Sequence, residues 1–318
     1  MKLALSALLA LSLTMPAAAQ TWPSKQIRMI VPYAPGGYTD IMARTVSQKL
    51  SEALGQSFIV ENRPGANSVI GADAVAKATP DGYTLGTVIA GHAANVSLNP
   101  KMPFDVLKDF TYVSLISTAP LLLVVRKDLP VNNLQELIAY AKSNPGHLTF
   151  GSSGIGSAAH LTMEGFQKAA GIKLLHVPYK GTAPALNDLL AGTIDMQLDT
   201  ASAFTAHVSA GTLRGIMMTS QERLSIAPDV PTMVELGFPD FVTGTWAGII
   251  APANTPKDIA DRIAKETAKA MQAPAMKETL AKQGYVPVGS TPEEFDRFVR
   301  EEVVRMGNIV HEANIKIE

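Results

Sequence analysis

The sequence predicts an α/β protein with two Rossmann-like lobes that are joined by a hinge of two chain crossings. Strand-like and helix-like runs alternate along the 318 residues, and no low-complexity linker divides them. Alternation is typical of parallel βαβ units, and a chain of this length suffices for two domains. Because no single linker separates the domains, we expect the second to interrupt the first. The first lobe then covers 20–120 and 246–318, and the second covers 121–245.

The N-terminal segment 1–19 has the pattern of a secretory signal peptide. Lys2 precedes an apolar run over 3–15, and residues 17–19 are three alanines, a typical cleavage site. The apolar run is too short to span a bilayer. We therefore expect cleavage after Ala19 and a periplasmic mature protein.

Composition argues against several functional classes. The 27 basic and 28 acidic residues give a formal net charge of −1, which argues against a nucleic-acid partner. The sequence has no cysteine and therefore no disulfide and no thiolate chemistry. Its six histidines show no metal-binding spacing. We expect neither a metal nor a cofactor.

The elements of the first lobe follow in order. The strand-like run 26–34 leads into a helix with Met42, Val46 and Leu50 on one apolar face, and Gly55 is the expected stop. Before the first crossing, the pattern predicts strands at 57–64, 83–90 and 109–117 and a helix at 68–78. After the return crossing, it predicts a strand at 243–252 and helices at 256–272, 274–283 and 292–310.

The middle block has the pattern of a complete α/β domain. Its expected strands are 120–128, 148–153, 173–179, 194–200 and 213–220. Its expected helices are 133–143, 157–170, 184–192 and 202–211. In open α/β sheets, ligands bind beyond the carboxyl ends of the strands. The strand-to-helix joints of both lobes are therefore the candidate sites.

The first candidate joint is 32–40, "PYAPGGYTD". Its two glycines allow backbone angles that other residues avoid, and their amides would form an anion-binding nest at the helix N-terminus. Thr39 and Asp40 are alternative caps for that helix. An ordinary turn is an equal alternative for the whole stretch. Tyr38 is unexpected in a glycine turn, and it either lines a pocket or covers the helix end.

The second candidate joint is 151–161, "GSSGIGSAAHL". Its amides and serine hydroxyls lie at a helix N-terminus, where they would donate to an anion. Three sharper motifs fit poorly: a dinucleotide fingerprint lacks its acidic partner, a P-loop lacks its lysine, and a nucleophile elbow has Ile155 in place of glycine. His160 is expected to be a packed helical residue. The competing hypothesis is an exported serine hydrolase that uses Ser153 and His160.

Two further joints lie in the second lobe. In "YKGTAP", Lys180 either attracts an anion or is solvated surface, and the later Asp195 is expected to be a structural cap. In "LDTASAF", Asp199, Thr200 and Ser202 follow a strand. Thr200 or Ser202 would either cap the next helix or face a ligand. Joints on both lobes that face one another across a hinge would make a clamshell.

Five stretches occur in a specific order: "WPSKQIRMIVPYAPGGYTDIMAR", "GQSFIVENRPGANSVIGADAVAKATPDGYTL", "FGSSGIGSAAHL", "VPYKGTAPALNDLLAGTID" and "WAGIIAPANTP". In them the chain resembles the substrate-binding proteins of tripartite tricarboxylate transporters. The resemblance covers essentially the whole mature chain. It implies a type II periplasmic-binding-protein fold, no catalysis, and transfer of a small organic acid to a membrane permease. A receptor that feeds a sensor kinase is an alternative that the sequence leaves open.

The resemblance also implies ligand contacts in both lobes, made largely by amides and hydroxyls. In the first lobe they are Tyr33, Ala34, Gly36, Gly37, Tyr38, Thr39 and His92. In the second lobe they are Ser152, Ser153, Gly154, Gly156, Ser157, Lys180, Gly181, Thr182 and Asp199. We expect a monomer that binds a di- or tricarboxylate, or an aromatic acid that stacks near Tyr33 or Tyr38.

Overall fold

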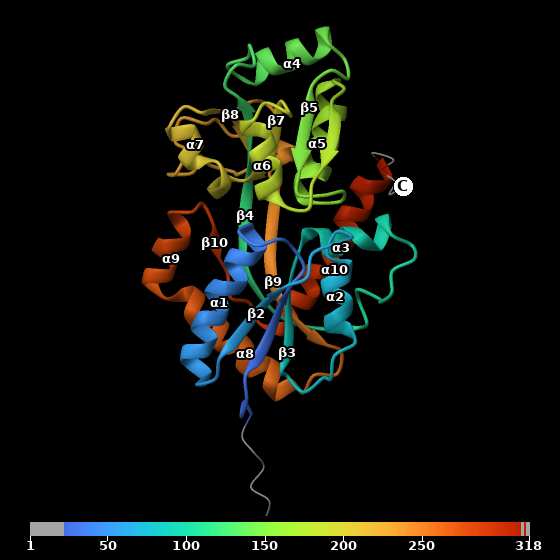
Figure 1. Ribbon diagram of the computed structural model, residues 1–318, viewed down its shortest axis with the longest axis vertical. Helices are drawn as coiled ribbons and strands as arrows, with labels where there is room; N and C mark the ends of the chain where they lie inside the picture. The colour runs from blue at the N-terminus through green and yellow to red at the C-terminus, as the bar shows by residue number, and fades with distance from the viewer. Residues whose placement is uncertain (1–21, 313–314, 316–318) are drawn as a thin grey trace, which may run out of the picture.

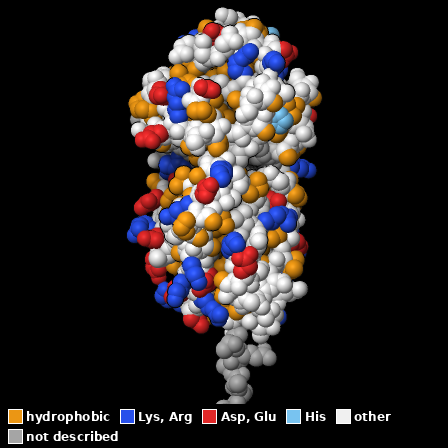
Figure 2. Space-filling view, turned by 90° about the vertical axis from the view of Figure 1, so that its left-hand side faces the viewer, with side chains coloured by type: hydrophobic (Ala, Val, Ile, Leu, Met, Phe, Trp, Pro, Cys, Tyr) orange, Lys and Arg blue, Asp and Glu red, His pale blue; other side chains and the backbone are white. Residues whose placement is uncertain are grey.

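A computed structural model describes residues 22–312 and 315 of the chain. The expected signal peptide, 1–19, lies outside these residues. Two lobes are stacked along the long axis (Figure 1), and a waist marks where they meet (Figure 2). Within the described residues, no helix combines the length and the apolar character that crossing a membrane requires.

Lobe I, the lower lobe in Figure 1, is built on a mixed sheet. β1 (Ile27–Val31) pairs in parallel with β2 (Phe58–Asn62) and β3 (Thr84–Ile89), as the alternating pattern predicts. β3 then pairs antiparallel with β9 (Gly244–Pro252), the strand on which the chain returns. The helices of this lobe are α1 (Tyr38–Leu54), α2 (Val69–Ala76), α3 (Ala90–Leu98), α8 (Lys257–Gln272), α9 (Pro274–Ala281) and α10 (Pro292–Glu312).

The lobes are connected by β9 and by β4 (Phe110–Arg126). The sequence predicts two strands here, but β4 is one continuous strand of 17 residues. It pairs with β9 as far as Pro120 and with strands of lobe II from Leu121 onward. Proline has no N–H to donate, and it stands where the strand changes partners, so it does not interrupt the ladder.

Lobe II, the upper lobe, has its own mixed sheet around the second half of β4. β5 (Thr149–Ser152) pairs in parallel with β6 (Leu175–Pro178) and β7 (Met196–Thr200). β7 and β8 (Leu213–Met218) both pair antiparallel with β4. The helices are α4 (Leu134–Ser143), α5 (Ala158–Ala170), α6 (Thr182–Leu190) and α7 (Thr205–Ser209), with 3-10 turns η1 (Ala201–Ala203) and η2 (Pro239–Phe241).

Other elements also differ from the sequence-based expectation. The helix expected over 202–211 is split into η1 and α7. The helix α3 is unexpected, because most of its residues are buried and it lacks the apolar stripe that marks a surface helix. The two-residue strand β10 (Val286–Pro287), which pairs with β4, is also unexpected.

The packing of α1 positions the functional cleft. Met42, Val46 and Leu50 are fully buried against the sheet, as their spacing predicts, and each contributes about 1.5–3 kcal/mol of apolar burial. Gly55 ends the helix in the left-handed conformation with φ of 72°. This packing fixes the helix axis, so that the N-terminus of α1 is held at the boundary between the lobes.

Candidate functional site

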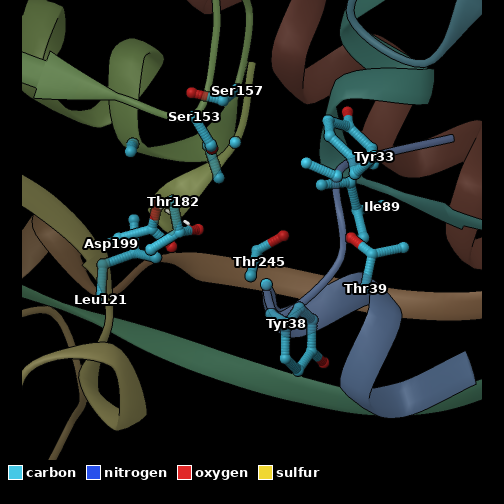
Figure 3. Close-up of a pocket in the computed structure, with 15 residues that line it drawn as sticks. Tyr33, Tyr38, Thr39, Ile89, Leu121, Ser153, Ser157, Thr182, Asp199 and Thr245 are labelled. Atoms are coloured by element: carbon cyan, nitrogen blue, oxygen red, sulfur yellow. Dashed lines mark hydrogen bonds between the residues drawn. The ribbon is translucent and has the colours of Figure 1, made fainter. Parts of the chain in front are cut away.

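A cavity of about 30 Å³ lies between the lobes, at joints where strands end and helices begin (Figure 3). It has room for about one or two water molecules. From lobe I and β9 it is lined by Tyr33, Ala34, Gly37, Tyr38, Thr39, Ile89 and Thr245. From lobe II it is lined by Leu121, Ser153, Ser157, Ala158, Ala159, Gly181, Thr182 and Asp199. The N-termini of α1, α5 and α6 therefore border one cavity, and helix N-termini favour anions.

The lobe I wall is held by Asp40. Its Oδ2 accepts from the Gly36 amide (3.0 Å) and from Arg44 Nε (3.0 Å), and its Oδ1 accepts from Asn62 Nδ2 (2.9 Å). Burial by itself raises the pKa of Asp40, but these hydrogen bonds hold it below its ordinary value. Asp40 thus ties the glycine turn to the first turn of α1. The N-cap residue is Gly37, so neither Thr39 nor Asp40 occupies the cap position.

Tyr38 lines the cavity, but its hydroxyl is hydrogen-bonded within lobe I. The hydroxyl donates to the Ser117 carbonyl oxygen at 2.9 Å and lies 2.8 Å from Ser117 Oγ. Its ring packs against Tyr285 with centroids 4.9 Å apart. Burial raises the pKa of Tyr38, so the phenol stays neutral. Tyr33 is fixed in a similar way, because its hydroxyl donates to Asn67 Oδ1 at 3.1 Å.

The lobe II wall is the loop between β5 and α5. Ser157 caps α5, because its hydroxyl oxygen accepts from the His160 amide at 3.2 Å. Ser153 and Ser157 both line the cavity. Ser152 faces away from the cavity, and its hydroxyl lies 2.7 Å from His176 Nε2. At the other end of the loop, the Gly156 amide donates to His160 Nδ1 at 3.1 Å.

Two stacked histidines support this loop from behind. The rings of His160 and His176 lie 3.9 Å apart and nearly parallel, and burial lowers their pKa values to about 4 and about 3. Both are therefore neutral at pH 7. His160 is a packed helical residue, as the sequence predicts. Because its Nδ1 accepts from the Gly156 amide, it is not arranged as a base for Ser153.

The rest of the lobe II side of the cavity is formed by the N-terminus of α6 and the end of β7. The Thr182 hydroxyl donates to Asp199 Oδ2 at 2.9 Å, and the Thr200 amide donates to Asp199 Oδ1 at 2.8 Å. Burial raises the pKa of Asp199 to about 6. Asp195, by contrast, has the structural role that the sequence predicts, because it accepts from the Thr149 amide and from Arg126 Nε.

The lobes touch on both sides of the cavity. Ser202 of η1 and Tyr285, which follows α9, share a hydrogen bond across the cleft. A Cβ placed on Gly181 would lie 3.5 Å from Ala34 Cβ, and one on Gly156 would lie 2.2 Å from Leu98 Cδ1. The structure therefore shows a closed arrangement of the two lobes.

Six of the predicted contacts do not line the cavity: Gly36, His92, Ser152, Gly154, Gly156 and Lys180. Four of them shape the loops beside the cavity: Gly36 lies between β1 and α1, and Ser152, Gly154 and Gly156 lie at the end of β5 or between β5 and α5. His92 is fully buried in lobe I, where its Nε2 lies 3.2 Å from the Tyr112 hydroxyl and its ring packs against Phe104 and Phe110. Burial lowers the pKa of His92 to about 3, so it supports the core as a neutral ring.

Five further residues line the cavity and are not among the contacts predicted from the sequence: Ile89, Leu121, Ala158, Ala159 and Thr245. Ala158 and Ala159 follow the serine loop directly. Leu121 and Thr245 adjoin the two chain crossings. Their place at the expected hinge is the one feature of the sequence that could have indicated them. Among the described residues, no group of three side chains of the kinds that bind metals is placed to hold an ion.

Comparisons with known proteins find relatives over most of the chain. The model of the tripartite tricarboxylate transporter family receptor matches residues 42–315. The chain is 40% identical to protein BugT of Bordetella pertussis over 305 residues, which is 95% of this chain and 94% of BugT. The periplasmic binding protein BugD superposes with a TM-score of 0.88 at 33% identity, over 93% of this chain and 100% of BugD.

Two structures from Rhodopseudomonas palustris were solved with organic acids. Rpa4515 with adipate has a TM-score of 0.89 at 35% identity, over 93% of this chain and 99% of that one. MatC with bound malate has a TM-score of 0.85 at 32% identity, over 91% and 99%. These likenesses confirm the two-lobed type II periplasmic-binding-protein fold. The chain therefore belongs to the tripartite tricarboxylate transporter receptor family and is a Bug-type member of it.

Proposed function

We propose that this protein is a periplasmic solute receptor that binds a small organic carboxylate between its lobes and delivers it to the membrane permease of a tripartite transporter. The observation that carries the proposal is the cavity bordered by the N-termini of α1, α5 and α6. Backbone amides at helix N-termini, together with hydroxyls, bind carboxylates without a fixed arginine. Relatives solved with adipate and malate support the ligand class.

Closure follows from the position of the cavity. A carboxylate that touches the lobe I wall and the lobe II wall binds the closed arrangement better than an open one, so it shifts the population toward closure. We propose that the lobes are 20–120 with 246–318, and 121–245, and that β4 and β9 bend between them. The closed monomer would present the surface that the permease recognises, after removal of segment 1–19 in the periplasm.

A thermal-shift panel on refolded protein tests this proposal. Refolding removes any copurified ligand that would mask a response. Adipate, malate and related mono-, di- and tricarboxylates, aromatic acids and amino acids are each added. An acid at about 100 times its dissociation constant is expected to stabilise the fold by roughly 2.7 kcal/mol. If no organic acid shifts the transition, the proposed ligand class is wrong.

A further inference from the structure

Asp199 differs from the other buried carboxylates among the described residues. Those carboxylates belong to Asp40, Asp199 and Glu302, which are 4%, 5% and 7% exposed. Asp40 is paired with Arg44 at 3.0 Å, and Glu302 with Arg305 at 2.6 Å. In the part of the chain that the structure describes, Asp199 has no such ion pair. A buried carboxylate without a cation is unfavourable, which makes a role in ligand binding the first explanation to test.

The carboxylate of Asp199 has capacity for a further partner. Each oxygen accepts one hydrogen bond within the protein, from Thr182 or from the Thr200 amide, whereas an ionised carboxyl group has about four acceptor positions. Asp199 lines the cavity, and no other aspartate, glutamate, lysine, arginine or histidine whose side chain the structure describes does so. These residues therefore give the cavity one unpaired negative charge and no positive side chain to balance it.

Thr245 provides a second, independent observation at the same cavity. Its hydroxyl oxygen is buried and has no hydrogen-bond partner among the described residues. Thr245 comes from β9, and the close-up shows it between the Asp199 side of the cavity and Tyr38 (Figure 3). A buried hydroxyl without a partner is unfavourable, so a polar ligand atom is expected there.

The two ends of the cavity differ in electrostatic character, because the N-terminus of α6 already has an anion of the protein beside it: Thr182 in its first turn donates to Asp199. The N-termini of α1 and α5 present amides and the Ser153 hydroxyl, which favour a carboxylate. A second carboxylate near Asp199 would meet a like charge. We propose that Asp199, with Thr245, binds an ammonium group of the ligand, so that the solute is a zwitterionic amino acid rather than a di- or tricarboxylate. This inference rests on the proposed function and narrows its ligand class.

Matched pairs of acids that differ in one ammonium group test the inference. The probes are aspartate with succinate, glutamate with glutarate, and 4-aminobutyrate with butyrate, titrated by calorimetry at pH 7.5 into refolded protein. We expect one amino acid to bind at least tenfold more tightly than its partner without nitrogen. Asp199→Asn, which keeps an acceptor for Thr182, is expected to abolish that preference. Asp128→Asn is the control, because the Asp128 side chain is 78% exposed.

The outcomes separate this inference from the proposed function. If succinate or glutarate binds as tightly as its amino partner, or if Asp199→Asn leaves the preference for the amino acid unchanged, the ammonium subsite is wrong while the carboxylate receptor stands. If no acid of either kind binds, the proposed function fails and the inference fails with it. If Asp199→Asn weakens both members of each pair equally, Asp199 has only a structural role and the inference is wrong.

Proton linkage gives a second readout that does not depend on a variant. The pKa of Asp199 is raised to about 6 by burial, so the free protein is partly protonated there at pH 6. The titratable group that faces it from lobe I is Tyr285, whose own pKa is raised, so that phenol remains neutral. An ammonium ligand favours the ionised carboxylate, and its binding at pH 6 releases protons. A dicarboxylate bound beside Asp199 takes protons up, which would contradict the inference. Calorimetry in buffers of different ionisation enthalpy distinguishes proton release from proton uptake.

Discussion

Asp199 lowers the stability of the ligand-free protein at neutral pH, because its charge is buried without a cation. The folded protein binds the Asp199 proton more tightly than the unfolded chain, in which an aspartate has a pKa of about 3.9. The stabilising effect of protonation is therefore complete below about pH 4 and is lost as the pH rises through about 6. Ligand binding is expected to recover part of this loss.

Asp199→Asn is therefore predicted to stabilise the ligand-free protein at pH 7. The expected gain in the free energy of unfolding is on the order of 1–3 kcal/mol, because the variant has no charge to bury. The gain should shrink toward zero as the pH is lowered to 4. Urea unfolding at several pH values measures it. A variant that is less stable than the wild type at pH 7 would show that the Asp199 charge is compensated within the protein.

At the scale of elements, the loop between β5 and α5 shapes the lobe II wall. Gly156 has φ of 77° and packs against lobe I, where a Cβ would lie 2.2 Å from Leu98 Cδ1 and 2.8 Å from Asn67 Nδ2. Asn67 is held by hydrogen bonds with Tyr33 and Asn95, so it does not yield easily. A side chain at 156 would therefore keep the lobes apart.

Gly156→Ala is predicted to weaken ligand binding at least tenfold. Gly192→Ala is the matched control, because Gly192 has the same φ of 77° but a Cβ placed on it would meet none of the described atoms within 4 Å. Both variants carry a similar backbone strain of about 1 kcal/mol, and only the first blocks closure. Calorimetric titration compares the two affinities. Equal affinities would mean that contact between the loop and lobe I is not needed for binding.

The sequence predicts elements well where the local pattern carries the information. The apolar face of α1 and its stop at Gly55 follow from spacing alone. The helix α3 is missed because it is buried on nearly every side and has no amphipathic period. Leu121 and Thr245 are missed because β4 and β9 bring them together from distant parts of the chain. His92 has no local sign that its ring is enclosed by Phe104 and Phe110.

At the scale of the whole molecule, the two crossings let the lobes move while a few contacts hold them closed. The hydrogen bond between Ser202 and Tyr285 spans the cleft, next to the packed rings of Tyr285 and Tyr38. Such a contact exists only in the closed arrangement. Because apparent affinity scales with the fraction of closed protein, the contact sets part of the affinity without touching the ligand.

Tyr285→Phe is predicted to lower ligand affinity about threefold to tenfold, which is the effect of one hydrogen bond worth about 0.5–1.5 kcal/mol. It should also enlarge the ligand-free radius of gyration measured by small-angle scattering. Tyr112→Phe is the control, since that hydroxyl donates to the Val106 carbonyl oxygen within lobe I. It should reduce stability and leave affinity unchanged. Equal effects of both variants on affinity would exclude a closing role for Tyr285.

The proposed function requires that one organic carboxylate is bound between the two lobes. A crystal structure of the refolded protein with the acid that gives the largest thermal shift tests it most directly. We expect a carboxylate within hydrogen-bonding distance of the amides at the N-termini of α1 and α5, with Ser153 and Thr39 beside it. An acid bound outside this cavity, or in contact with only one lobe, would contradict binding between the lobes.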